Sequence, residues 1–352
     1  MSDNTSEEEQ QQQMKEIFIS ADVWLEIFAL ISPRELGLKV ALISDRFDRL
    51  VDEHFKTRKW SLGTLQILPL FRGNGAQIYN GKNYMPIPQG PLPGKVIGFE
   101  WIQIRYIDRS VIELLQRIRR LFNSSGTTVA ICTFENQSRS WDIIRQKIWP
   151  LINDNIRHLR VCAASQLDRL RQDFPAILRN CTNLRSIDGL FPVFPVDDNA
   201  NASSNKAVAK WVLARREDGR PNLLYCDDFD STAMEGLKRA FVNASQPANF
   251  IIRLEPFFMW GIRRFDAVLR TFELTNNLTR ERLNLRRQCS RSWLLVRSPI
   301  EREKAKWDKW EKEAIQLRWT RQWNCIFINF NDMDIGDGML DANDKGPSEP
   351  KK

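Results

Sequence analysis

The chain has 352 residues, of which 42% are hydrophobic, and a formal net charge of +8 at pH 7. This length and apolar content suffice for one large domain, or for a small and a large one, each with its own core. The start is acidic and Gln-rich, and no apolar run nears the roughly 18 residues that span a bilayer, so we expect no secretory signal, no membrane partner and a cytoplasmic or nuclear protein.

The N-terminal end is predicted to be a solvated tail. Residues 1–16 carry one Lys against five acids and four Gln in succession, a composition that cannot bury a core. We therefore assign residues 1–16 to a disordered segment and begin the folded chain at residue 17.

The first predicted helix starts after Ser20. Ser20 is a suitable N-cap, and Asp22 places a negative charge in the first turn, where the helix dipole favours it. Apolar residues then recur at the i, i+4, i+7, i+8 spacing of one helix face: Val23, Ile27, Leu30 and Ile31.

Two more short helices are predicted downstream. Ser32-Pro33-Arg34-Glu35 has the pattern of a capping box with proline at the first helical position, and Ser44-Asp45 opens the third helix. About forty residues rarely support a stable core without help. The apolar faces must therefore bury against the rest of the chain or against a partner.

A set of short motifs occurs in a fixed order over about residues 17–60: Asp22-Val23-Trp24, Glu26-Ile27-Phe28, Ser32-Pro33 with Leu36, Ala41-Leu42-Ile43-Ser44, and Arg46-Phe47 with Leu50. This order resembles the F-box, the helical motif of proteins that dock on the Skp-type adaptor of cullin-based ubiquitin ligases. Many F-boxes open on Leu-Pro, whereas the matching pair here is Ile19-Ser20.

The resemblance implies that residues 17–60 bind the Skp-type adaptor and, through it, the cullin and RING subunits. Leu42 and Phe47 are expected to hold the three helices together. The residues expected to dock on the adaptor are Ile19, Val23, Trp24, Ile27, Phe28, Pro33, Leu36, Leu38 and Val40.

Residues 61–94 are predicted to be a linker. Six glycines and five prolines fall within this segment, and prolines as close together as those at 86, 88, 91 and 93 break helix and strand alike. Gly73-Asn74-Gly75 lacks the further glycine of a dinucleotide loop and the Lys-Ser/Thr of a P-loop, so it predicts a turn and no phosphate site.

Residues 95–330 alternate strand-like and helix-like segments, which favours an α/β or α+β domain with parallel strands. The expected strands are 96–107, 127–134, 156–162, 184–187, 222–226 and 249–254. The expected helices are 110–122, 140–152, 166–179, 205–216 and 231–243.

Two strand-like units, Ile156-Arg157-His158-Leu159 and Leu184-Arg185-Ser186-Ile187, are 28 residues apart, and each follows an Asn. This offset lies in the range of leucine-rich repeats. We therefore expect a degenerate, leucine-rich-repeat-like α/β layer, with a compact α/β domain as the competing fold. The resemblance to F-box proteins implies that this domain binds the target.

The C-terminal part is predicted to add strands and one helix. Residues 270–288 favour a hairpin turning at Asn276-Asn277, with further strands at 293–296 and 325–330 and a charged helix at 300–314. Tryptophans in this part are expected to pack against the sheet. Residues 331–352 carry six acids against three Lys and are assigned to a second disordered tail.

The residue pattern favours no catalytic, metal or cofactor site. The six cysteines lie at least 19 residues apart, without the close Cys or His pairs of a zinc site, and fit buried reduced thiols. His54 and His158 have no neighbouring nucleophile motif. We expect a non-catalytic subunit and no cofactor.

The predicted function is therefore an F-box adaptor that presents an unknown target protein for ubiquitination. Residues 253–323 carry 17 Lys and Arg against nine acids. Such a basic segment suits an acidic protein partner, and we do not expect nucleic acid to be the main partner. The alternative is an F-box scaffold that acts outside a ligase and associates with nucleic acid through this basic half.

Overall fold

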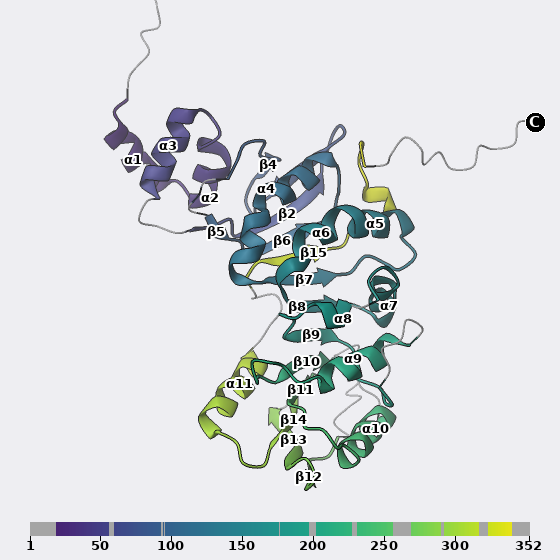
Figure 1. Cartoon of the computed structure of the whole chain (residues 1–352). Coiled ribbons are helices and arrows are strands. Elements are labelled where there is room, and N and C mark those ends of the chain that lie inside the picture. The colour runs from purple at the N-terminus through teal and green to yellow at the C-terminus, as the bar shows by residue number, and fades with distance from the viewer. Residues whose placement is uncertain are drawn as a thin grey trace, which may run out of the picture. The chain divides into compact units, whose positions relative to one another are not determined.

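The computed structural model describes residues 19–55, 60–92, 94, 96–175, 177–196, 202–226, 231–255, 269–289, 292–316 and 323–339 (Figure 1). The predictions for residues 1–16 and 340–352 lie outside these ranges. The chain divides into two compact units. The N-terminal unit lies within residues 1–60 and 92–95, and the sheet unit within residues 61–91 and 96–352.

Short helices build the N-terminal unit, as predicted: α1 (Ala21–Leu30), α2 (Pro33–Glu35), η1 (Leu36–Val40) and α3 (Asp45–His54). The hydroxyl of Ser32 accepts from the Glu35 amide at 3.3 Å, and that of Ser44 accepts from the Phe47 amide at 3.4 Å. Ser20 occupies the N-cap position of α1 but makes no side-chain cap bond. The second helix continues from α2 into η1, a single π-helical turn.

The sheet unit is built on one large, mostly parallel sheet. In the described part of the chain the sheet has thirteen strands, ordered β12-β13-β14-β11-β10-β9-β8-β7-β15-β6-β2-β3-β4. Its eight central strands are parallel: β11 (Phe250–Leu254), β10 (Asn222–Cys226), β9 (Ser186–Gly189), β8 (Ile156–Val161), β7 (Thr127–Ile131), β15 (Cys325–Ile328), β6 (Trp101–Ile104) and β2 (Thr64–Pro69).

Antiparallel strands flank the parallel centre on both sides. One edge has β3 (Ala76–Tyr79) and β4 (Tyr84–Pro86), and the other has β14 (Ser292–Pro299), β13 (Glu281–Cys289) and β12 (Phe272–Asn276). The predicted hairpin is confirmed, because β12 and β13 pair directly across residues 277–280. The short strands β1 (Trp60–Ser61) and β5 (Val96–Gly98) lie outside the large sheet.

Helical segments connect the successive parallel strands. They are α4 (Arg109–Ser125), α5 (Ser138–Ile143), η2 (Ile144–Ile148), α6 (Trp149–Ile152), η3 (Asn153–Asn155), α7 (Ala164–Asp173), α8 (Ile177–Asn180), α9 (Ser204–Leu213) and α10 (Ser231–Val242). Helix α4 begins where Asp108 accepts from the Val111 amide at 3.0 Å, and it ends at Gly126, whose φ of 84° suits glycine.

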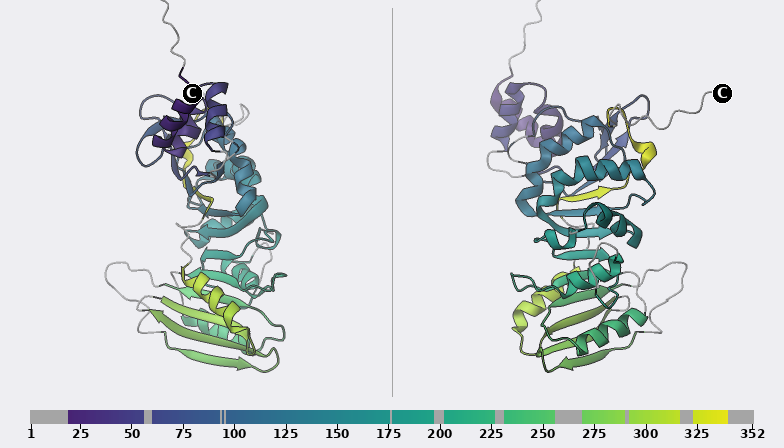
Figure 2. Two further views of the ribbon diagram at one scale, coloured as in Figure 1. Left: turned by 90° about the vertical axis from the view of Figure 1, so that its left-hand side faces the viewer. Right: turned by 45° about the vertical axis from the view of Figure 1, so that its right-hand side comes forward.

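Helix α11 (Lys304–Gln316) covers the face of the sheet opposite to α9 and α10 (Figures 1 and 2). Trp307 and Ala314 pack there against Leu223 of β10 and Ile251 of β11. This packing places two of the C-terminal tryptophans, Trp307 and its neighbour Trp310, on the sheet as expected.

The predicted linker, residues 61–94, contains strands β2, β3 and β4 of the sheet. Gly73, Gly75 and Gly81 lie in the turns between these strands, all with positive φ. Pro69 and Pro86 are the last residues of their strands, and Pro86 is on the edge strand, where a missing amide costs no ladder hydrogen bond. Glycine and proline therefore mark strand ends here, so the segment is not an unstructured connection.

The folded region also extends beyond Phe330. A 3-10 turn, η5 (Asp332–Asp334), follows β15, and Ile335 forms a parallel bridge with Ile107. The carboxylate of Asp332 accepts from the backbone and hydroxyl of Ser140, both at 2.8 Å. Residues 331–339 thus pack on the sheet unit. Their acidic composition had led us to predict that they belong to the disordered tail, residues 331–352, and for residues 331–339 this prediction is wrong.

None of the helices in the described ranges is both long and apolar enough to cross a membrane.

Candidate functional site

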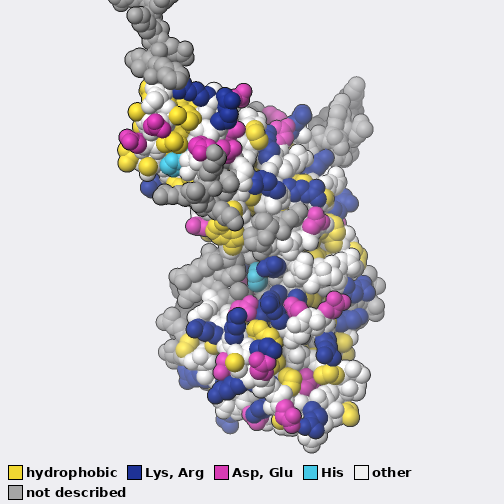
Figure 3. Space-filling view, turned by 60° about the vertical axis from the view of Figure 1, so that its left-hand side comes forward, with side chains coloured by type: hydrophobic (Ala, Val, Ile, Leu, Met, Phe, Trp, Pro, Cys, Tyr) yellow, Lys and Arg dark blue, Asp and Glu magenta, His cyan; other side chains and the backbone are white. Residues whose placement is uncertain are grey.

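An exposed apolar row runs along α1. Val23, Ile27 and Leu30 share one face of this helix, and the exposed fractions of Val23 and Leu30 are 46% and 89%. Ile43, in the turn before α3, is a further apolar residue with 65% of its surface exposed. In Figure 3 hydrophobic side chains gather on the visible face of the N-terminal unit. Adjacent exposed apolar side chains typically mark an interaction site.

The opposite side of α1 is anchored by aromatic packing. The Trp24 ring meets the Phe47 ring edge-on at 4.8 Å, and Phe28 lies 6.4 Å from Phe47 and 6.0 Å from His54 between ring centroids. The Arg46 guanidinium donates to the carbonyl of Ile19 at 2.7 Å, which joins α3 to the start of α1. The expected role of Phe47 in holding the helices together agrees with these contacts.

The predicted docking residues divide by exposure. Phe28 and Leu36 are fully buried and Leu38 is 5% exposed, so their side chains belong to the interior and present no contact surface. The remaining residues are exposed or half-buried: Ile19, Val23, Trp24, Ile27, Pro33 and Val40. Docking by Phe28, Leu36 and Leu38 stays a prediction, and in this chain the three side chains are part of the interior, a distinction that motif matching does not make.

Leu30 and Ile43 were absent from the predicted docking residues, although they are the most exposed large apolar side chains of the described N-terminal unit. For Leu30 the signal was present in the sequence, since it falls seven residues after Val23 on the same helix face. Ile43 lies in a turn, where hydrophobic periodicity does not apply, so the sequence pattern could not predict that it is exposed.

In the sheet unit, the carboxyl ends of the central strands form a second candidate region. A cavity of about 1080 Å³ lies there, bordered by Arg105, Asn329 and the exposed aromatic side chains of Phe71, Tyr84 and Phe134. Ligands of parallel sheets commonly bind at this edge. The aromatic rings offer apolar contacts, and Arg105 and Asn329 offer hydrogen bonds.

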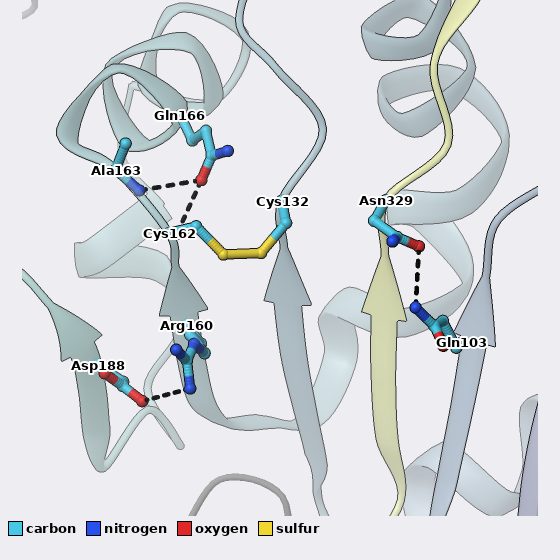
Figure 4. Close-up of a disulfide and its surroundings, with 8 residues drawn as sticks. All are labelled: Gln103, Cys132, Arg160, Cys162, Ala163, Gln166, Asp188 and Asn329. Atoms are coloured by element: carbon cyan, nitrogen blue, oxygen red, sulfur yellow. Dashed lines mark hydrogen bonds and ion pairs between the residues drawn. A yellow bond between two sulfur atoms is a disulfide. The ribbon is translucent and has the colours of Figure 1, made fainter. Parts of the chain in front are cut away.

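A disulfide lies at the same edge (Figure 4). Cys132 and Cys162 follow the neighbouring strands β7 and β8 and are joined, with their Cα atoms 5.5 Å apart. The side-chain oxygen of Gln166 accepts from the Cys162 amide at 2.8 Å and fixes this end of β8. The expectation that all six cysteines are reduced thiols is wrong for this pair. The two cysteines are 30 residues apart in the sequence, and only the pairing of two parallel strands brings them together.

Several arginines of the basic C-terminal half pair with acids. Arg297 pairs with Glu281 at 2.6 Å, Arg286 and Arg302 both reach Glu311, and Arg280 pairs with Glu301. In Figure 3 the dark blue Lys and Arg side chains on the visible face of the sheet unit are interspersed with magenta acids. This mixture differs from the single-sign stripe that typically follows a nucleic-acid backbone.

His158 on β8 is held in the sheet. Its Nδ1 lies 2.5 Å from the Ser186 hydroxyl on β9. Burial lowers the pKa of His158 to about 4; nearby Glu313 acts in the opposite direction, and Arg185 and Arg157 lower the pKa further. Among the residues that the structure describes, no group of three or more His, Cys, Asp or Glu is placed to hold a metal ion.

No protein-family model, curated protein or solved structure matches this chain.

Proposed function

We propose that this chain is an F-box-type adaptor: its N-terminal unit docks on the Skp-type subunit of a cullin-RING ubiquitin ligase, and its sheet unit presents a target protein. The observation that carries the proposal is the apolar row on α1, where Val23 and Leu30 are exposed and Ile27 is half-buried, in a small unit whose residue order resembles the F-box. Covering Leu30, which is 89% exposed, together with its neighbours would bury apolar surface and favour binding of a partner.

The packing of α1 supports this division of roles. Trp24, Phe28 and Phe47 fix the helix from one side, so the row on the other side is presented on a rigid scaffold. A preorganised helix face loses little conformational entropy on binding. The ligase then works by proximity, because the adaptor raises the local concentration of the target near the charged ubiquitin-conjugating enzyme.

We further propose that the sheet unit is a degenerate leucine-rich-repeat-like layer. Strands β7 to β11 lie side by side in chain order, and helical segments join each pair. This succession of parallel strands and helical segments supports a repeated strand–helix unit.

For the target we propose the cavity at the carboxyl ends of the parallel strands. Phe71, Tyr84 and Phe134 are exposed there and would anchor an apolar side chain of the target, and Arg105 suits an acidic one.

Co-purification with the Skp-type adaptor tests the proposal. The full chain is expected to retain the adaptor, and the double variant Val23→Asp/Leu30→Asp is expected to lose it, because two charges would be buried in an apolar contact. Leu278→Asp is the matched control: Leu278 is 75% exposed in the sheet unit, and its substitution should leave binding unchanged. Failure of the wild-type chain to retain the adaptor would overturn the proposal.

A further inference from the structure

The disulfide between Cys132 and Cys162 is accessible from outside the sheet unit. Cys162 is exposed, and Cys132 is half-buried and lines the cavity of about 1080 Å³ at the carboxyl edge of the sheet. Disulfides that serve only stability resist reduction, whereas exposed disulfides are typically the labile and regulatory ones. A thiol reductant can therefore reach this bond while the chain stays folded.

The ends of the two strands are also held without the bond. β7 and β8 are neighbours in the parallel sheet, and the amide of Cys132 donates to the carbonyl of Ile328 on β15 at 2.8 Å. The side-chain oxygen of Gln166, which is 3% exposed, accepts from the amide of Cys162 at 2.8 Å. Because these hydrogen bonds do not involve the sulfur atoms, we expect the sheet to remain in place when the disulfide opens.

Helix α7 lies next to one of the two sulfur atoms. Cys162 is two residues before the first residue of this ten-residue helix, Ala164, as Figure 4 shows. The N-terminus of a helix carries a partial positive charge, which favours a thiolate over a thiol. This environment favours the thiolate of Cys162, the form that attacks when the bond closes again.

The disulfide restrains part of the cavity wall. Cys132 and Phe134, two residues further along the chain, both line the cavity, and Phe134 is 61% exposed. The bond ties the side chain of Cys132 to the end of β8. Once the bond is open, this side chain is free to change its rotamer. The state of one bond thus changes how firmly this side of the cavity is held.

From these observations we infer that Cys132 and Cys162 form a reversible redox site that controls the wall of this cavity. The closed bond restrains the segment from Cys132 to Phe134, and the open bond releases it. Control of target binding by this site rests on the proposed function. Opening of the bond does not rest on it and is measured without a target.

Reduction of the site follows thiol–disulfide exchange with a thiol reductant. A reductant thiolate attacks the exposed Sγ of Cys162 and forms a mixed disulfide there, while Cys132 leaves as a thiolate. A second reductant thiolate then attacks the sulfur of the first reductant molecule and releases Cys162. The pair gains two electrons, the two protons come from the reductant thiols, and the two reductant molecules end as one disulfide.

Thiol alkylation of the native full chain, read by mass spectrometry, measures how easily the bond opens. In about 10 mM reduced glutathione the pair should be closed at a reduced-to-oxidised ratio of about 1:1 and open at about 1000:1, the range in which regulatory disulfides exchange. A bond that stays closed at the higher ratio would be structural only. That result, or a pair already open at the lower ratio, would overturn the inference.

Amide exchange tests the effect on the cavity wall. In wild type, residues 132–137 should exchange at least about threefold faster with the bond open, whereas residues 222–226 of β10 should not change. Cys132→Ser/Cys162→Ser should show the faster exchange in both glutathione buffers. Cys289→Ser removes an exposed free cysteine of β13 and should respond as wild type does. Equal exchange in the open and closed states of wild type would contradict control of the wall.

Discussion

Arg297 and Glu281 form a buried ion pair between β14 and β13. Each side chain is 2% exposed, and the guanidinium lies 2.6 Å from the carboxylate. Glu281 also accepts from the Ala248 amide at 2.8 Å, and Arg297 donates to the carbonyl of Gln246 at 3.0 Å. The pair thus joins the hairpin to the segment that precedes β11, and its charges are fully matched.

Removing one partner should be strongly destabilising. We expect Glu281→Gln to lower the free energy of unfolding by about 3 kcal/mol, because it leaves the Arg297 charge buried without a counterion. The exposed pair of Arg280 and Glu301 is the control, and Glu301→Gln should cost less than about 1 kcal/mol. Urea unfolding of both variants measures the difference, and comparable losses would contradict the account.

His158 makes the stability of the sheet unit depend on pH. Its pKa in the folded chain is about 4, below the ordinary value of 6.5, so between these values the unfolded chain binds more protons. The free energy of unfolding should therefore fall as the pH decreases from about 6.5 to 4. His158→Gln should lose less stability than wild type between pH 7.5 and pH 5 in urea titrations; equal losses would exclude His158 as the cause.

At the residue scale, sequence patterns predicted which side chains share a helix face better than they predicted which side chains are buried. The face containing Val23, Ile27 and Leu30 followed from spacing, but the burial of Phe28 and Leu36 depends on where Phe47 and His54 pack. Similarly, no pattern predicts the disulfide of Cys132 and Cys162, because only the parallel pairing of β7 and β8 makes these residues neighbours.

Among the elements, the ends of α9 and α10 are each capped by an asparagine on a strand, Asn222 and Asn276. Asn276 ends β12, and its amide donates to the carbonyls of Phe241 at 2.8 Å and Ala244 at 2.9 Å at the end of α10. Its oxygen organises the turn into β13 through Leu278 and Thr279. One side chain therefore closes a helix and starts a hairpin.

Asn276→Ala should weaken both elements together. We expect a loss of about 2–3 kcal/mol in the free energy of unfolding, since a buried cap and two turn hydrogen bonds disappear. Asn284→Ala on β13 is the control, because Asn284 makes an exposed contact with Glu273, and it should cost less than about 1 kcal/mol. A loss no larger than that of the control would contradict the capping role.

Element types were predictable where periodicity was strong. Residues 222–226 form β10 as expected, and the predicted helix 110–122 appears as α4 with one extra turn. The strands of the glycine- and proline-rich segment 61–94 were not predictable, because they are short and rely on pairing: β2 pairs with β6, β3 with β2, and β4 with β3. Tertiary contacts override local composition there.

At the scale of the whole molecule, the chain has two compact units with separate interiors. The N-terminal interior contains Phe28, Leu36 and Val51, and the sheet unit contains its own layers on both faces of the strands. The order of the strands was not predictable from the sequence. In particular, β15 enters between β6 and β7 after more than 190 residues of intervening chain, a contact that no local pattern encodes.

A cavity created by mutation in the interior of one unit should destabilise that unit and leave the other unit unchanged. Phe28→Ala/Leu36→Ala removes two fully buried side chains and should destabilise the N-terminal unit by several kcal/mol, at about 2–5 kcal/mol for each. Amide exchange should then rise across residues 21–54, while residues 127–131 and 250–254 keep their protection. Exchange that rises equally in both units would contradict their independence.

The most direct test of adaptor docking is a calorimetric titration of the Skp-type adaptor into the full chain. The account predicts a one-to-one complex for wild type, an affinity lower by at least about thirtyfold for Leu30→Asp, as for a contact worth about 2 kcal/mol, and no change for Leu278→Asp. Wild-type affinity in the Leu30→Asp variant, or no complex with the wild-type chain, would contradict it.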